Sequence, residues 1–371
     1  MKPNIFNFAT KELSQDAFLC YLLEFSKEEY KKYEKEHIFA NIFLKNILNK
    51  FSLDIEIKKL EIKKQYNNID ILLILNDEYY IIIEDKTFTS ERKKQIISYK
   101  DKLKKILEND RVNFDEEKIY GLYFKIGDEC LQRIEEKEKI KIKGMNIKSL
   151  LRKEIINIFE NYSGENIIFN DYISYIKEIQ ERTENFSKVD LRKEMFTWGE
   201  VNGFYNALDL EFTKLKKEKI LPQDIKFNWD YVANQNGGFM CYNFDNAFNR
   251  LNFEKYGYYM QIEARGRNRD ESRGEDYFEK DLRFPVKVWS DEKNIDILYK
   301  GFEILKKEKT FSDGIRPLRF SKGRWMTQLI ITDYLVLNEN GTINISKTAL
   351  NIIKYLKAIV KMEGKLKNLE D

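Results

Sequence analysis

A chain of 371 residues in which 42% of the side chains are hydrophobic and 14% are aromatic can bury a large core, which excludes general disorder. Its formal charge of +3 is too small to indicate nucleic-acid binding by itself, so a basic site would have to be local. The single histidine, the three widely spaced cysteines and the lack of phosphate-loop or dinucleotide glycine patterns argue against histidine-pair, disulfide, zinc and nucleotide-driven chemistry.

The first 128 residues predict alternating helices and strands. In chain order we expect helices near residues 10–25 and 28–51, an alternating strand over 53–65, two buried apolar strands at 69–75 and 79–83, a helix over 91–107 and a strand at 118–127. Strands that are apolar on both sides suit the centre of a sheet covered by helices. The fold class is therefore predicted to be α/β, with the core order helix, three strands, helix, strand.

The remaining chain predicts two further regions. Residues 129–194 are expected to be mostly helical and to extend the core formed by residues 1–128. Residues 195–371 predict an α+β domain that binds substrate or a partner. Its β-like runs are 237–244, 256–264, 281–289 and 327–337, and its helices lie near 291–307 and 346–362.

Charged residues stand at the ends of the two buried strands. If "NDE" at residues 76–78 forms a hairpin bend, positions summing to 154 face each other, and Asp70 lies opposite Glu84. Side chains at such positions have Cβ atoms about 4.5–5.5 Å apart. Because two carboxylates at this distance repel, a cation between them is expected.

Strand alternation places Glu84 and Lys86 on the same face as Asp70, and Asp85 on the other. The two carboxylates, together with the carbonyl of Asp85, would form the hard oxygen site that Mg²⁺ prefers. Lys86 could then orient or deprotonate a water for phosphodiester hydrolysis. The alternative is that these charges simply leave the strand ends and enter solvent. The ExK pattern alone decides nothing, because it recurs elsewhere, for example at Glu56.

Together "NID" at 68–70, "EDK" at 84–86 and "QIISY" at 95–99 resemble the PD-(D/E)XK nuclease superfamily and the QxxxY motif of its RecB-like branch. The segments "NIFNFATKELSQDAFLCYLL" and "GLYFKIGD" are also similar to a bacterial subfamily of it. The resemblance covers about a third of the chain and implies a restriction-endonuclease-like fold. Ile69 replaces the proline of the family motif, a common variation in that branch.

This resemblance implies metal-dependent cleavage of nucleic acid. Asp70 and Glu84 would bind Mg²⁺, with Mn²⁺ as a substitute, and Lys86 would act on the attacking water. Glu12 is expected to complete the acidic set, ahead of Asp16, although a carboxylate in a first helical turn is also stabilised by the helix dipole. Gln95 and Tyr99 would hold substrate or catalytic groups, or else form an ordinary helix-packing pair.

Two arginine-containing stretches lie in the second region. The one around Arg265 is interrupted by acids, which favours a self-neutralised surface loop. The other, "RPLRFSKGRW", has almost no acid after Asp313, and it is the better candidate for contacts with phosphates. Its candidate nucleic-acid-binding residues are Arg316, Arg319, Lys322 and Arg324.

We therefore expect an Mg²⁺-dependent nuclease acting on DNA, in a setting such as restriction, repair or defence. The alternatives are a module that binds nucleic acid or protein without cutting, and an acidic cluster with a purely structural role. A homodimer would suit two cuts in a duplex, although no sequence feature demonstrates one. No apolar run approaches the roughly 18–20 residues that span a bilayer, and the N-terminus lacks the apolar stretch of a secretion signal, so a soluble cytoplasmic protein is expected.

Overall fold

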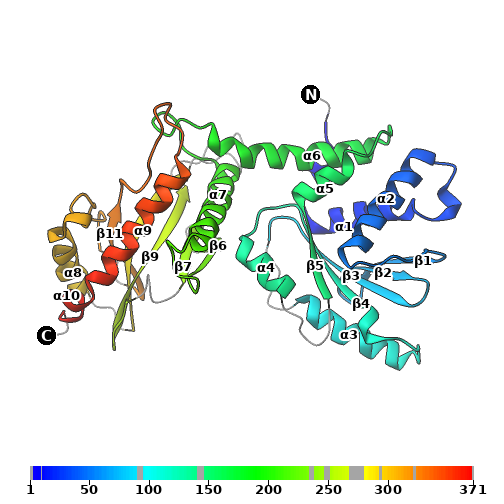
Figure 1. Ribbon diagram of the computed structural model, residues 1–371, viewed down its shortest axis with the longest axis horizontal. Coiled ribbons are helices and arrows are strands. Elements are labelled where there is room, and N and C mark those ends of the chain that lie inside the picture. Colours follow the sequence, from blue (N-terminus) through cyan, green and yellow to red (C-terminus); the bar gives the residue numbers. More distant parts are fainter. Residues whose placement is uncertain are drawn as a thin grey trace. The chain divides into compact units, whose positions relative to one another are not determined.

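The computed structural model describes residues 3–9, 11–89, 95–139, 146–233, 238–245, 251–266, 280–291, 295–320 and 323–369. The chain divides into two compact units (Figure 1). The first consists of residues 1–128 and 133–181, and the second of residues 129–132 and 182–371.

The first unit is built on a five-stranded mixed sheet in the order β1-β2-β3-β4-β5. Neighbouring strands are antiparallel from β1 to β3 and parallel from β3 to β5. The elements that lie wholly or mostly in this unit are α1 (Glu12–Glu24), α2 (Glu34–Lys50), β1 (Leu60–Tyr66), β2 (Ile69–Leu75), β3 (Tyr79–Lys86), α3 (Gln95–Asn109), β4 (Ile119–Lys125), α4 (Leu131–Lys139), β5 (Asn146–Leu151), α5 (Arg152–Phe159) and α6 (Ile167–Glu184).

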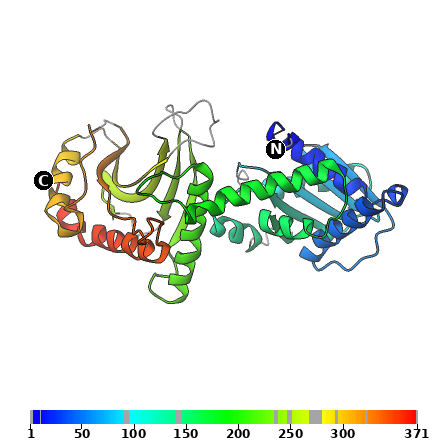
Figure 2. The same cartoon turned by 90° about the horizontal axis from the view of Figure 1, so that it is seen from above.

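Both faces of this sheet are buried, as the near-continuous apolar runs predict. Odd-numbered side chains such as Leu73 and Ile81 pack with the helices α1, α2, α5 and α6, whereas even-numbered ones such as Leu72 and Ile82 pack with α3. Figure 2 shows the blue helices α1 and α2 against the sheet from a second direction. Over residues 71–75 and 79–83, each side chain thereby belongs to one of two cores, and the α3 core receives the even-numbered positions.

One sequence expectation for this unit is wrong, and one strand is additional to the predicted elements. The strand expected over 53–65 begins only at Leu60, because the side chain of Asn76 bonds the backbone of the preceding residues: its Oδ1 accepts from the amides of Lys58 and Lys59, and its Nδ2 donates to the carbonyl of Glu56. The region 129–194 also contains a strand, β5, which pairs in parallel with β4. Its six residues are too short and too rich in polar side chains to give a clear period.

The second unit contains an antiparallel sheet of six strands in the order β11-β10-β9-β7-β6, with β8 paired to β9. Its elements are α7 (Trp198–Lys217), β6 (Lys226–Val232), β7 (Phe239–Asp245), β8 (Leu251–Asn252), β9 (Tyr256–Gly266), β10 (Lys280–Ser290), α8 (Ile295–Lys307), β11 (Trp325–Ile331), α9 (Ile345–Lys361) and α10 (Glu363–Lys367). One sheet face forms the core of this unit, which includes residues of α7, α8 and α9. The protein is thus a mixed α/β protein with one mixed and one antiparallel sheet.

Among the described residues, no helix combines the length and the apolar character that crossing a membrane requires.

Candidate active site

The hairpin of β2 and β3 sets the position of the two acidic strand ends. Ile71 pairs with Ile83, so the predicted register, in which facing positions sum to 154, is confirmed. The bend begins at Asn76 and Asp77, whose φ angles are 54° and 57°. Asn and Asp tolerate this left-handed conformation better than most residues, which explains the tight turn. Asp70 and Glu84 each lie one residue beyond the pair Ile71 and Ile83.

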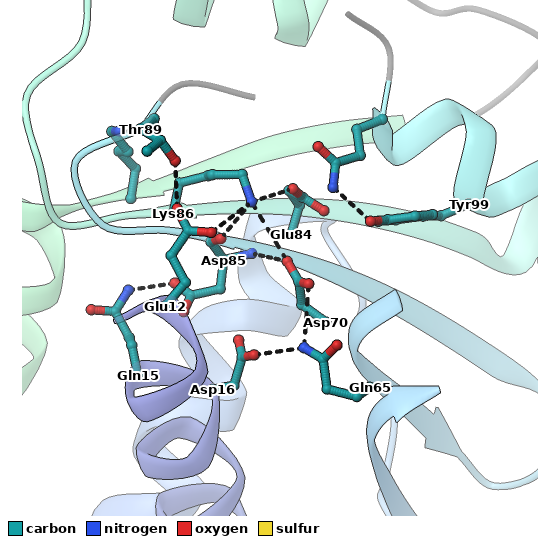
Figure 3. Close-up of polar contacts among 12 residues, drawn as sticks. Glu12, Gln15, Asp16, Gln65, Asp70, Glu84, Asp85, Lys86, Thr89 and Tyr99 are labelled. Atoms are coloured by element: carbon teal, nitrogen blue, oxygen red, sulfur yellow. Dashed lines mark hydrogen bonds and ion pairs between the residues drawn. The ribbon is translucent and has the colours of Figure 1, made fainter. Parts of the chain in front are cut away.

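Lys86 is the centre of the polar contacts at this end of the sheet (Figure 3). Its Nζ lies 2.6 Å from Glu84 Oε1 and 3.8 Å from Asp70 Oδ2, and it donates a hydrogen bond of 3.0 Å to the backbone carbonyl of Asp85. Two carboxylates and a carbonyl thus converge on one positive charge. The structure brings together the three residues that the strand pattern predicts on one face.

Burial makes these charges depend on each other. Glu84 has no exposed surface, and Lys86 is 6% exposed. Burial by itself would lower the pKa of Lys86, but its contact with Glu84 and the charges of Glu12 and Asp70 outweigh burial and raise that pKa. The ammonium therefore remains protonated and compensates the buried carboxylate, which accounts for the charges at the ends of apolar strands.

Glu12 reaches the same ammonium from the first turn of α1. Its Oε2 lies 3.4 Å from Lys86 Nζ, and its Oε1 accepts a hydrogen bond from the hydroxyl of Thr89. About one third of the Glu12 side chain is exposed, so it lies at the solvent edge of the cluster. The sequence favours Glu12 over Asp16 as the acid that completes the set, and in the structure Glu12 is the one of these two that contacts Lys86.

Asp85 points to the opposite face of β3, toward α1 (Figure 3). Its Oδ1 accepts a hydrogen bond from Gln15, and its backbone amide donates one of 3.1 Å to Asp70 Oδ2. Strand alternation predicted this orientation. Asp85 therefore presents its backbone carbonyl, and not its carboxylate, to Lys86.

Asp16 and Asp85 form a buried acidic pair beneath the cluster. Burial and the charge of Asp70 raise the pKa of Asp16 to about 6, and burial and the charge of Asp16 raise the pKa of Asp85 well above its ordinary value. Asp16 Oδ1 and Asp85 Oδ2 have no donor among the described residues, and a proton shared between them would satisfy both. Full ionisation of both carboxylates is therefore unfavourable in the folded unit.

Two glutamines connect these groups, and sequence reasoning missed both. Gln65 Nε2, from β1, donates to Asp16 Oδ2 at 2.8 Å and lies 3.5 Å from Asp70 Oδ1. Gln15, from α1, bonds Asp85 and accepts a 3.4 Å hydrogen bond from Tyr172. The sequence signal for Gln15 is only its place beside Asp16, in a helix that contributes Glu12.

Gln95 and Tyr99 lie one helical turn apart on α3 and bond each other, with Gln95 Nε2 2.6 Å from the Tyr99 hydroxyl. Tyr99 is buried in the core between α3 and the sheet face that carries Glu84. Burial raises its pKa, as do the charges of Glu84 and Asp70, while the bond to Gln95 lowers it. The hydroxyl is therefore neutral near pH 7 and lies within the electrostatic reach of the cluster.

The predicted basic residues of the second unit fall in different environments. Arg316 lies over the rings of Tyr299 and Phe320, at 4.9 and 4.7 Å from the centroids. Arg319 lines a cavity, and Arg324 is exposed and 3.4 Å from Asp291. Lys322 lies outside the described residues. Direct contacts between described residues do not join these three arginines into one cluster.

The oxygens around Lys86 suit a hard cation, because Asp70 and Glu84 supply carboxylates and Asp85 supplies a carbonyl that point toward one positive group. As arranged, however, no group of three or more His, Cys, Asp or Glu side chains within the described residues is placed to hold a metal ion. Comparisons with protein-family models, curated proteins and solved structures give no match for this chain.

Proposed function

We propose that the first unit is a metal-dependent nuclease that hydrolyses phosphodiester bonds, with DNA as the expected substrate. The observation that carries this proposal is the convergence of Asp70, Glu84 and the Asp85 carbonyl on the buried ammonium of Lys86. The resemblance of "NID", "EDK" and "QIISY" to the PD-(D/E)XK superfamily supports it, as does the mixed sheet between helices, which is compatible with a restriction-endonuclease-like core. Fold alone would not specify an activity, so the proposal rests on the site.

The donor set fits Mg²⁺, with Mn²⁺ as a substitute. Asp70 and Glu84 would hold the ion through carboxylate oxygens, Asp85 through its carbonyl, and Glu12 would complete the acidic set. A bound ion would supply Lewis-acid stabilisation of phosphate charge and would lower the pKa of a water molecule. These residues already surround one cation, the ammonium of Lys86, so the site is prepared for positive charge.

The residues of the chain have separate tasks in this proposal. Lys86 holds and orients the attacking water through its ammonium, and the contacts with Glu84 and Glu12 fix where that ammonium lies. The Asp85 amide and Gln65 fix the orientation of the Asp70 carboxylate. The neutral hydroxyl of Tyr99, held by Gln95, would donate a hydrogen bond to a substrate phosphate.

The second unit would supply additional contacts with nucleic acid. Arg319 and Arg324 are exposed, and Arg316 is exposed over two aromatic rings, so all three are available for phosphate contacts. Such contacts position the backbone of a nucleic acid and carry no sequence information.

A cleavage assay tests the proposal directly. The full chain is incubated with supercoiled plasmid, linear duplex, single-stranded DNA or RNA in Mg²⁺, Mn²⁺ or EDTA, and it is compared with Lys86→Ala. Lys59→Ala is the matched control, because Lys59 is an exposed lysine of the same unit that pairs with Asp77 on the surface. Cutting that needs metal, is lost in Lys86→Ala and persists in Lys59→Ala is the expected result.

One observation favours a second candidate function, a module that binds nucleic acid or protein without cutting. Lys86 already supplies a positive charge to the acidic cluster, and within the described chain no three metal-ligating side chains are grouped as a site. Such a module would bind its partner equally in Mg²⁺ and in EDTA, and Lys86→Ala would leave that binding unchanged. Absence of cleavage on every substrate, with this pattern of binding, would replace the nuclease proposal.

A further inference from the structure

The face of the second sheet that points away from its hydrophobic core carries a cavity of about 280 Å³. On β9 and β10 the even-numbered residues, such as Ile262 and Phe284, enter the core, whereas the odd-numbered residues line the cavity. The lining side chains with chemical function are Glu263, Arg265, Arg283, Lys287, Arg319 and Trp325. This cavity is separate from the acidic cluster, which lies in the first unit.

Opposite charges alternate on this face in a regular pattern. Arg265 Nε lies 2.6 Å from Glu263 on β9, and Arg283 Nε lies 2.7 Å from Asp281 on β10. In the antiparallel register Arg265 stands opposite Asp281, and Arg283 opposite Glu263. Each bond uses the Nε–H, one of the five N–H groups of a guanidinium. The terminal nitrogens thus retain donors with which to bind an anion, and the carboxylates hold each guanidinium in place.

The inner part of the cavity is a buried ion pair. Glu263 is 2% exposed, and its Oε1 lies 2.9 Å from the Nζ of Lys287, which is 7% exposed. Burial opposes the charge of Glu263, but Lys287 and Arg265 outweigh it and hold the pKa of Glu263 below its ordinary value. Gln261 also donates to Glu263 at 2.6 Å. Because Glu263 already bonds three residues, it holds Lys287 and Arg265 in place and is not available to a ligand.

The charge of the cavity is positive after these pairs are counted. Four cations, Arg265, Arg283, Lys287 and Arg319, line it, and Glu263 and Asp281 are the two carboxylates paired with them. Four positive and two negative charges leave an excess of two. Arg319, which is exposed, has no carboxylate partner among the described residues. The cavity is therefore suited to a group with about two negative charges, such as a phosphate monoester.

Trp325 adds a flat aromatic surface beside the arginines. Its side chain is 60% exposed although it is large and apolar, and Tyr259 supports it in an edge-on contact with ring centroids 5.7 Å apart. An exposed indole next to guanidinium groups can stack a planar heterocycle while the arginines bind an attached phosphate. Nucleotides combine these two groups in one molecule.

We propose that this cavity is a nucleotide-binding site, with the phosphate held by Arg283 and Arg319 and the base stacked on Trp325. At about 280 Å³ the cavity suits one nucleotide and not an extended strand. The nucleotide could be a free molecule or one unit of a nucleic acid, and the two share the same chemistry. The proposal does not depend on the nuclease activity of the first unit.

Calorimetric titration of the full chain tests this proposal, in EDTA and at low salt so that cleavage plays no part. The probes are AMP, ATP, a short oligothymidylate and inorganic phosphate. We expect saturable binding of a nucleotide probe that weakens as salt increases and that exceeds the binding of inorganic phosphate. Binding of AMP or ATP identifies a free nucleotide as the ligand class, and binding of the oligothymidylate alone identifies a unit of a strand.

Three variants assign the binding to the cavity. Arg319→Gln and Trp325→Ala change exposed side chains and should each weaken nucleotide binding about tenfold, because one removes a charge-assisted hydrogen bond and the other a stacking surface. Lys365→Gln is the matched control, since Lys365 is an exposed cation of the same unit that pairs with Glu308 on the surface and lies outside the cavity lining. No saturable binding, equal binding of phosphate and nucleotide, or binding unchanged in Arg319→Gln and Trp325→Ala would overturn the proposal.

Discussion

The ammonium of Lys86 lies 2.6 Å from Oε1 of Glu84, a carboxylate with no exposed surface. Each charge is buried and therefore needs the other. A buried pair of this kind contributes little net stability, but losing one partner is costly because the remaining charge stays out of water. The stability of the first unit consequently reports on the site even where no substrate is known.

Replacing Lys86 by Met should destabilise the first unit in EDTA, because Glu84 loses its compensating charge. The expected loss of unfolding free energy is about 3–5 kcal/mol, measured by urea unfolding of the full chain. Millimolar Mg²⁺ should restore part of this loss by occupying the position of the missing charge. Lys59→Met, on the exposed surface, should unfold like the native chain. A Lys86→Met variant as stable as the native chain would show that Glu84 does not need the charge of Lys86.

Substituting Asp70 by Asn should remove the response of the protein to Mg²⁺. If the acidic set binds the ion, Mg²⁺ raises the melting temperature of the native chain, because a ligand that binds the folded state stabilises it. Asp70→Asn keeps the size of the side chain and its acceptor for the Asp85 amide but removes the charge. Differential scanning calorimetry with and without Mg²⁺ measures the effect, and Asp77→Asn in the exposed hairpin bend is the control. An undiminished Mg²⁺ response in Asp70→Asn would exclude this carboxylate as a ligand.

The buried acid Asp16 predicts a pH-dependent stability. Its pKa is about 6 in the folded chain and 3.8 for the free side chain, so between these values the folded state binds the additional proton. Stability therefore falls as pH rises from about 4 to 6. Asp16→Asn removes the contribution of Asp16 to this dependence, although the raised pKa of Asp85 continues to contribute, and the new amide can still accept from Gln65 and donate to Asp85. Its melting temperature should exceed that of the native chain by a few degrees at pH 7, and the difference should disappear near pH 4.

Tyr99→Phe should lower the rate of cleavage about tenfold while leaving the melting temperature nearly unchanged. The substitution keeps the ring in the core against α3 and removes only the hydroxyl that Gln95 contacts. Because the pKa of Tyr99 is raised, the hydroxyl stays protonated between pH 7 and 9, and the ratio of the two rates should be constant over that range. Steady-state kinetics across this range checks both points. A loss of thermal stability with unchanged kinetics would assign Tyr99 to packing alone.

The hairpin and its site were accessible from the sequence because they depend on local rules. A short bend between two strands fixes the register, so the approach of Asp70 to Glu84 follows from counting residues, and the period of two places Asp85 on the other face. Gln65 and Gln15 were not accessible in this way. They belong to β1 and α1, and tertiary packing alone brings these elements to the hairpin.

Hydrogen bonds from one side chain to the backbone explain why the strand expected over 53–65 begins only at Leu60. Residues 53–59 alternate like a strand, but Asn76 bonds their backbone through its side chain, and such a bond between distant residues leaves no periodic signal. The cavity on the second sheet was also missed. The alternation of charge in "QIEARG" is visible, but only the antiparallel register with β10 reveals that Arg283 stands opposite Glu263.

Residues 129–132 lie between two segments of the first unit but pack with the second. The Leu131 amide donates to Asp209, the Cys130 thiol donates to the carbonyl of Phe227, and Gln132 accepts from the amide of Phe227. A fragment that starts at residue 182 would therefore lack a part of its own interior, and Asp209 would lose one of its donors. The second unit could not be exchanged by a single cut and fusion near residue 181. Recombination between related chains would have to transfer residues 129–132 and 182–371 together. Because the first of these stretches lies between two segments of the first unit, this requirement favours inheritance of the two units as one piece.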